Sequence, residues 1–198
     1  MTKIYFVRHA EPEHAWENDR TRPLTAEGMR DSEKVRETLA PVRLDFAISS
    51  PYVRSMETIR RCADNHGLQI YTDERLRERE KGPGGNNYGM FQKRWSNFRY
   101  HEDGGESLAM VQARNMEAVL ELLGCHRSQN ILFGTHGTAL STILNYFNPD
   151  FGCGDFLRII DYMPYIIRLD FEGLECVCKE ELLIVSKEFK GKNRADLK

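Results

Sequence analysis

Long hydrophobic runs are missing from this sequence of 198 residues. Only four successive apolar residues, Ile4 to Val7, precede Arg8, whereas a signal peptide needs about 7–15 and a membrane-spanning helix about 20. We therefore expect a soluble, cytoplasmic protein that binds no membrane. An excess of basic residues is missing too: the formal net charge is −2, which argues against nucleic acid as a partner.

Cysteine pairs of the kind found in redox or zinc sites are also absent. The five cysteines include no Cys-x-x-Cys spacing, and their number is odd. We expect buried, reduced thiols at Cys62, Cys125, Cys153, Cys176 and Cys178.

Repeats, low-complexity segments and interdomain linkers are lacking as well. A chain of this length can bury about 70% of the surface it exposes when unfolded, so a single domain needs no disulfide or metal staples. We place this domain at residues 1–185, before a charged C-terminal tail at 186–198.

Short apolar runs alternate with segments that carry helix-capping signals. The runs predict strands at residues 3–7, 45–48, 68–71, 130–133 and 165–169, with an edge strand near 174–178. Capping residues predict helices from Thr25 to about Leu39, from Ser50-Pro51 to Gly67, from Ser107 to Gly124, and over 138–147. This alternation predicts an α/β fold, a three-layer α/β/α sandwich with a mainly parallel sheet and a mixed edge.

One long connection interrupts the alternation. The 35 residues from Thr72 to Glu106 are rich in glycine, arginine and aromatic residues, and such connections are more often functional than accidental. The glycine-rich stretch 82–89 lacks the Lys-Ser/Thr ending of a nucleotide-binding P-loop. We expect a lid-like insertion at about residues 79–105, whose aromatic side chains form either its underside or part of a leaving-group pocket.

Charged side chains follow the predicted parallel strands. Arg8 and His9 come directly after the first strand, and Arg54 lies one turn into the helix after the second. Glu78 follows the third strand, and His136 follows the fourth. Because ligands of such sheets bind beyond the carboxyl ends of the strands, these side chains are candidates for one site.

This set of side chains suits phosphoryl transfer. Two guanidinium groups and an imidazolium can bind phosphoryl oxygens through charge-assisted hydrogen bonds. A second imidazole can attack phosphorus and carry the phosphoryl group as phosphohistidine. A nearby carboxylic acid can protonate the departing alkoxide and later help to activate water.

Six short motifs follow one another between Phe6 and Gly137, over about two thirds of the chain. They are Phe6-Val7-Arg8-His9-Ala10-Glu11, Arg22-Pro23-Leu24-Thr25-Ala26-Glu27-Gly28, Ser49-Ser50-Pro51-Tyr52-Val53-Arg54-Ser55-Met56-Glu57-Thr58, Leu76-Arg77-Glu78, Gly104-Gly105-Glu106-Ser107 and Thr135-His136-Gly137. Because these motifs occur in this order, the chain resembles the histidine phosphatase superfamily, branch 1, also called phosphoglycerate mutase-like. The resemblance implies that family's fold and a reaction that needs no metal and no other cofactor.

The resemblance also implies residue roles. His9 matches the phosphohistidine nucleophile, and Glu78 matches the proton donor to the leaving group. Arg8, Arg54 and His136 match the phosphate pocket, in which His136 also takes part in catalysis. Glu106 lies where phosphatase-type members keep a Gly-Glu-Ser turn at the pocket rim, which implies a supporting role in binding the substrate phosphate.

Several alternatives stay open at these positions. Residues 79–87 separate Glu78 from the Tyr-Gly step that usually follows the acid, so Glu80 competes with Glu78, which we favour. A solvated charge run is a further interpretation of the segment around Glu78. A metal cluster of His9, Glu11, Glu13 and His14 matches no standard spacing. The other histidines, His14, His66, His101 and His126, are interpreted as structural.

Hydrolysis of a phosphomonoester is the predicted reaction, with a small phosphorylated metabolite as the partner. The mutases of the family usually begin with Arg-His-Gly-Glu-Ser followed by a Trp-Asn pair, whereas this chain has Glu11-Pro12 where Glu-Ser would stand and has no Trp-Asn. A phosphoglycerate mutase-type phosphotransferase and a non-catalytic phosphate-binding regulatory module are the alternatives. The edge strand near 174–178 is a candidate surface for a homodimer.

Overall fold

The computed structural model describes residues 1–187 and contains one six-stranded sheet in the order β3-β2-β4-β1-β5-β6. The strands are β1 (Thr2–Arg8), β2 (Phe46–Ser49), β3 (Ile70–Thr72), β4 (Asn130–Thr135), β5 (Tyr162–Glu172) and β6 (Glu175–Ser186). The first four strands run parallel to one another, whereas β5 pairs antiparallel with both β1 and β6. The predicted α/β fold with a mainly parallel sheet and a mixed edge is confirmed.

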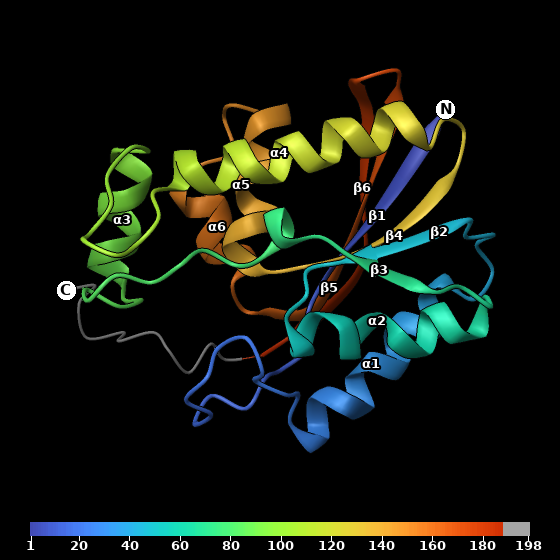
Figure 1. Cartoon of the computed structure of the whole chain (residues 1–198), viewed down its shortest axis with the longest axis horizontal. Helices are drawn as coiled ribbons and strands as arrows, with labels where there is room; N and C mark the ends of the chain where they lie inside the picture. Colours follow the sequence, from blue (N-terminus) through green and yellow to red (C-terminus); the bar gives the residue numbers. More distant parts are fainter. Residues whose placement is uncertain (188–198) are drawn as a thin grey trace.

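Helices cover both faces of this sheet (Figure 1). One face carries α1 (Ala26–Leu39) and α2 (Val53–Asn65), and the other carries α4 (Leu108–Cys125), α5 (Gly137–Phe147) and α6 (Cys153–Ile159). Side chains alternate along β1, so Tyr5 and Val7 join the core beneath α1 and α2, while Ile4 and Phe6 join the core on the opposite face.

The predicted capping residues at two helices are confirmed. The side chain of Thr25 accepts a hydrogen bond from Gly28 N at 2.9 Å, and Ser107 accepts one from Met110 N at 3.1 Å. The predicted cap of α2 is wrong, because the helix begins at Val53 and has no side-chain cap.

The long connection contains two elements that the sequence patterns did not predict as helices. A short 3-10 helix, η1 (Glu74–Leu76), is followed by α3 (Tyr88–Ser96). On α3, Phe91 and Trp95 pack against Phe156 of α6, with ring centroids 5.1 and 5.7 Å apart, while Trp95 also contacts Phe151. The lid-like insertion is thus anchored to the helical layer through its aromatic residues.

The cysteines are free thiols, but their predicted burial holds only in part. Cys62 is buried in α2, whereas Cys125 and Cys178 are exposed. The exposure of these two thiols follows from their positions: Cys125 ends α4, and Cys178 lies on the edge strand β6.

The C-terminal end of the described chain remains part of the fold. Strand β6 is longer than predicted and reaches Ser186, and Lys187 forms an ion pair with Asp31 of α1 at 2.8 Å. The rest of the predicted charged tail, residues 188–198, lies outside the described residues. Within residues 1–187, no helix is long and apolar enough to cross a membrane.

Candidate active site

A cavity of about 360 Å³ lies beyond the carboxyl ends of the parallel strands. Its walls come from the end of β1, the loop after β1, the first turns of α2 and α5, the insertion, and α6 with the residues that follow it. The lining includes Arg8, His9, His14, Asp19, Arg22, Arg54, Glu78, Arg79, Lys81, Asn86, Phe91, Gly137 and Thr138. The structure therefore brings four of the predicted site residues together in one cavity.

Arg8 ends β1 and is 2% exposed. Its Nη1 donates hydrogen bonds to the carbonyls of Ile159 at 2.5 Å and Tyr162 at 2.8 Å. Burial lowers the pKa of this guanidinium to about 10, so Arg8 still carries its charge at neutral pH. Gly137 allows the close approach of Arg8, because a Cβ there would lie 3.2 Å from Arg8 Nε.

His9 is held in one tautomer. Its Nδ1 lies 2.8 Å from the carbonyl of Ala10. A carbonyl only accepts, so Nδ1 carries the hydrogen and Nε2 carries the lone pair. Burial, together with the charges of Arg54 and Arg8, holds the pKa of His9 well below 6.5. His9 is therefore a neutral imidazole at neutral pH.

His136 lies next to His9 and is completely buried, and it is not among the residues that line the cavity. The two imidazole rings meet edge to face, with centroids 5.3 Å apart. Burial and the charge of Arg54 lower the pKa of His136 well below 6.5, so the imidazolium expected from the sequence is replaced by a neutral ring.

Ser50 is a site residue that the sequence patterns assigned to a helix cap. Its hydroxyl lies 2.7 Å from Nε2 of His136. Within residues 1–187, Nδ1 of His136 is buried without a hydrogen-bond partner. The sequence did offer a signal for this role, because Ser50 comes directly after β2, as Arg8 and His9 come at the end of β1.

The guanidinium of Arg54 binds Asp19, a residue of the loop after β1. Nη1 donates to the carbonyl of Asp19 at 2.5 Å, and Nη2 lies 3.3 Å from Asp19 Oδ2. The other oxygen of Asp19 pairs with Arg22 Nη1 at 2.7 Å, and Arg22 also donates to the carbonyl of Trp16. No sequence pattern pointed to Asp19, which reaches the cavity through the path of the loop.

Glu78 binds the first turn of α5. Its Oε1 accepts from Ala139 N at 3.2 Å and from Arg79 N at 2.8 Å, and its Oε2 accepts from Thr138 N at 3.1 Å. Glu78 lines the cavity, whereas Glu80 is exposed and is not among the lining residues. Of the two candidate acids, the structure thus places Glu78 beside Arg8 and His9.

Glu106 lies outside the cavity lining, although the resemblance implied a supporting role in phosphate binding. Its carboxylate accepts hydrogen bonds from Arg77 and Arg114 and from the backbone of Glu80. An ionised carboxylate only accepts hydrogen bonds and therefore cannot donate one to a phosphate. The contacts of Glu106 are structural.

His14 was interpreted as structural from the sequence, but it lines the cavity. The insertion adds Arg79, Lys81, Asn86 and Phe91 to the walls, so one of its aromatic residues does reach the cavity. Among residues 1–187, no three His, Cys, Asp or Glu side chains are grouped so that they could hold a metal ion.

Comparison with known proteins gives the same family as the motifs. The model of the histidine phosphatase superfamily (branch 1) matches residues 4–180. A probable phosphoglycerate mutase GpmB from Enterobacter sp. (strain 638) is 28% identical over 168 residues, which cover 73% of this chain and 74% of that protein.

Similar solved structures include YhfR of Bacillus stearothermophilus, with a TM-score of 0.74 and 23% identity over 97% of this chain and 98% of that one. A phosphoserine phosphatase from Entamoeba histolytica in complex with 3-phosphoglyceric acid has a TM-score of 0.74 and 19% identity, covering 95% and 98% of the two chains. A mycobacterial glucosyl-3-phosphoglycerate phosphatase has a TM-score of 0.70 and 16% identity, covering 94% and 99%. With the family model matching most of its length, the chain belongs to the histidine phosphatase superfamily, branch 1.

Proposed function

We propose that the protein is a metal-independent phosphomonoester hydrolase that works through a phosphohistidine at His9. The observation that supports this most is the state of His9. Its hydrogen is held on Nδ1 by the Ala10 carbonyl, its pKa lies well below 6.5, and it lines a cavity together with four arginines. A neutral imidazole with an unprotonated Nε2 is the form that attacks phosphorus.

In the first step, Nε2 of His9 forms a bond to phosphorus while the bond from phosphorus to the leaving oxygen breaks. Glu78, protonated for this step, transfers its proton to that oxygen. In the second step, water attacks phosphorus and gives a proton to the Glu78 carboxylate as the P–N bond breaks. Inorganic phosphate leaves, and His9 returns to its neutral form.

The buried arginines stabilise the charge on the transferred group. Arg8 and Arg54 are 2% and 3% exposed, and their remaining N–H groups serve the phosphoryl oxygens. Donors fixed in a low-dielectric site act more strongly than donors in water, and they need no reorganisation during the reaction.

His136 contributes a neutral donor to the same group. Ser50 Oγ lies 2.7 Å from Nε2 of His136, and we assign the hydrogen of this bond to the hydroxyl, so that the hydrogen of His136 lies on Nδ1, the atom that has no partner within residues 1–187. This N–H donates to a phosphoryl oxygen when the substrate is bound.

The substrate is a small phosphorylated metabolite with a second anionic group. Five cationic side chains line the cavity, Arg8, Arg22, Arg54, Arg79 and Lys81, against the two carboxylates of Asp19 and Glu78. A phosphoryl dianion leaves part of this excess unbalanced, so a carboxylate nearby is favoured. The names of the similar phosphatase structures, with phosphoserine, 3-phosphoglyceric acid and glucosyl-3-phosphoglycerate, point to such compounds.

Phosphoryl transfer between two positions of a phosphoglycerate is the second candidate. It is favoured by the curated relatives, which are named as probable phosphoglycerate mutases. The phosphatase names of the similar structures and the absence of the usual mutase motifs favour hydrolysis.

The decisive experiment measures phosphate release from p-nitrophenyl phosphate in the presence of EDTA. We expect activity in the wild type, loss of activity in His9→Ala, and wild-type activity in the control His101→Ala, whose side chain is exposed. Acid-labile phosphate bound to the wild type, and absent from His9→Ala, would identify the phosphohistidine.

A second assay separates the candidates by following 3-phosphoglycerate. Release of inorganic phosphate supports the hydrolase, whereas conversion to 2-phosphoglycerate without release supports the mutase. Phosphate binding without either reaction would leave only a non-catalytic binding module.

A further inference from the structure

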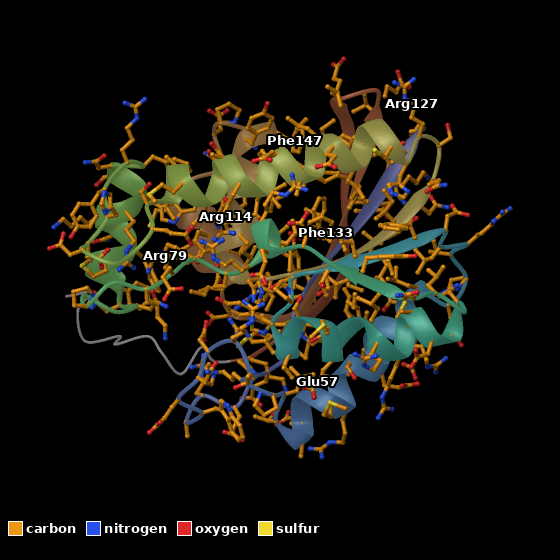
Figure 2. The ribbon with its side chains drawn as sticks, viewed as in Figure 1. Glu57, Arg79, Arg114, Arg127, Phe133 and Phe147 are labelled. Carbon is orange, nitrogen blue, oxygen red and sulfur yellow. The ribbon has the colours of Figure 1, made fainter. Side chains whose placement is uncertain are left out.

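The backbone around Glu78 is held by one side chain from a distant helix. Arg114 projects from α4 towards η1 (Figure 2), and its Nη1 donates to the carbonyls of Arg75 and Arg77, both at 2.7 Å. Its Nη2 donates to the carbonyl of Glu78 at 3.1 Å. Residues 77–80 form neither helix nor strand, so no regular element supplies donors for the carbonyls of Arg77 and Glu78.

Glu106 completes the arrangement. Its two oxygens accept from Nε and Nη2 of Arg114, both at 2.8 Å, in the bidentate geometry that fixes a guanidinium in its plane. The same carboxylate accepts from the backbone N of Glu80 at 2.9 Å and from Arg77 at 2.7 Å. The pair therefore binds the chain on both sides of Glu78.

This ion pair lies mostly out of water, since the side chains of Arg114 and Glu106 are 12% and 9% exposed. Burial by itself raises the pKa of Glu106, but the bonds from Arg114 and the Glu80 amide outweigh it and hold the pKa below its ordinary value. Glu106 is therefore ionised at neutral pH. A buried ion pair contributes little net stability compared with apolar packing, so its directional hydrogen bonds are its main contribution here.

We propose that Arg114 and Glu106 are positioning residues that hold Glu78 in place for proton transfer to the leaving group. This inference rests on the proposed function, in which Glu78 is the acid. The Glu78 carboxylate is otherwise held by three backbone amides at 2.8–3.2 Å, so a shift of its own backbone moves the carboxyl group relative to α5. A displacement of about 1 Å can slow an enzymatic step about 100-fold.

The test uses two aryl phosphates that differ in their need for an acid. Phenol is a weaker acid than p-nitrophenol, so phenyl phosphate depends on protonation of its leaving oxygen far more than p-nitrophenyl phosphate does. In Arg114→Lys and Glu106→Gln, we expect kcat/KM for phenyl phosphate, which reports formation of the phosphohistidine, to fall by about 10- to 100-fold. We expect kcat/KM for p-nitrophenyl phosphate to fall by less than about threefold, because its leaving oxygen needs little protonation and Arg8 and Arg54 are untouched.

Arg75→Gln is the matched control. The Arg75 side chain forms ion pairs with Asp73, Glu117 and Glu121 in the same region, but it donates to none of the carbonyls that Arg114 binds. We expect the ratio of the two kcat/KM values to be unchanged in this variant. The ratio is measured on one preparation, so it is independent of any loss of folded protein.

A double variant distinguishes positioning from a separate effect. If Arg114 acts through Glu78, then Glu78→Gln/Arg114→Lys hydrolyses phenyl phosphate no more slowly than Glu78→Gln alone. Losses that multiply would overturn the inference, as would unchanged ratios in Arg114→Lys and Glu106→Gln when Glu78→Gln changes its ratio. If Glu78→Gln itself leaves the ratio unchanged, the acid of the proposed function is wrong, and the positioning role falls with it.

Discussion

Acidification should destabilise this protein through two buried, neutral histidines of the candidate site, His9 and His136. Burial holds the pKa values of His9 and His136 well below 6.5 in the folded state, whereas in the unfolded chain both return to about 6.5. Below that pH the unfolded state binds two protons that the folded state does not, so the free energy of unfolding falls as the pH falls. The effect is absent above the unfolded pKa and grows until the folded pKa values are reached.

The size of the effect follows from this linkage. Between pH 7.5 and pH 5.5, each such histidine lowers the free energy of unfolding by about 1.4 kcal/mol, and the two together lower it by about 2.7 kcal/mol. For a domain whose total stability is about 5–15 kcal/mol, this change is large enough to measure.

Urea unfolding followed by far-UV circular dichroism, in phosphate-free buffers at the two pH values, provides the assay. The variant His9→Asn/His136→Asn retains every other titrating group, so its pH dependence is the baseline. We expect the wild type to lose about 2.7 kcal/mol more than the variant between the two pH values. Equal losses in the two proteins would refute the argument that both rings are neutral because they are buried.

Three further results are expected from the geometry of the cavity. Ser50→Ala removes the hydroxyl that binds His136. We expect kcat/KM for p-nitrophenyl phosphate to fall about tenfold, because one hydrogen bond of about 1.4 kcal/mol is lost. An unchanged kcat/KM would show that Ser50 has no role in the site. Asp19→Asn removes the carboxylate that competes with phosphate for Arg54. We therefore expect the inhibition constant for inorganic phosphate to decrease. An increase would show that Asp19 instead orients Arg54. Because the pKa of His9 is depressed, the acidic limb of the kcat/KM profile should lie below pH 6.5; a limb centred at or above this value would contradict a neutral His9.

Much of the fold was predictable because its signals are local. Thr25 and Ser107 cap the helices they were expected to cap, and the parallel strands lie where short apolar runs occur. Helix α6 was missed because it has only seven residues and contains Gly154. Strand β6 extends well beyond its predicted range because polar residues fill much of its exposed edge position, where no alternating pattern is required.

The residues of the candidate site likewise divide into those that local sequence predicts and those that it does not. Arg8, His9 and Glu78 were predictable because each follows a strand that ends at one edge of the sheet. Arg114 was not, because nothing local separates it from other arginines on amphipathic helices; its role comes from carbonyls more than 35 residues away in the chain. Asp19 likewise reaches Arg54 only through the path of an irregular loop.

The two tryptophans lie in two different segments that line this cavity, so fluorescence can distinguish these segments. Trp16 belongs to the loop that carries Asp19 and is 48% exposed, so it should emit at the longer wavelengths of a hydrated indole. Trp95 is packed by α3 against Phe151 and Phe156 of the helical layer and should emit at shorter wavelengths. In a Trp95→Phe protein, the remaining fluorescence would therefore report the arrival of a phosphorylated ligand at the loop, without any label.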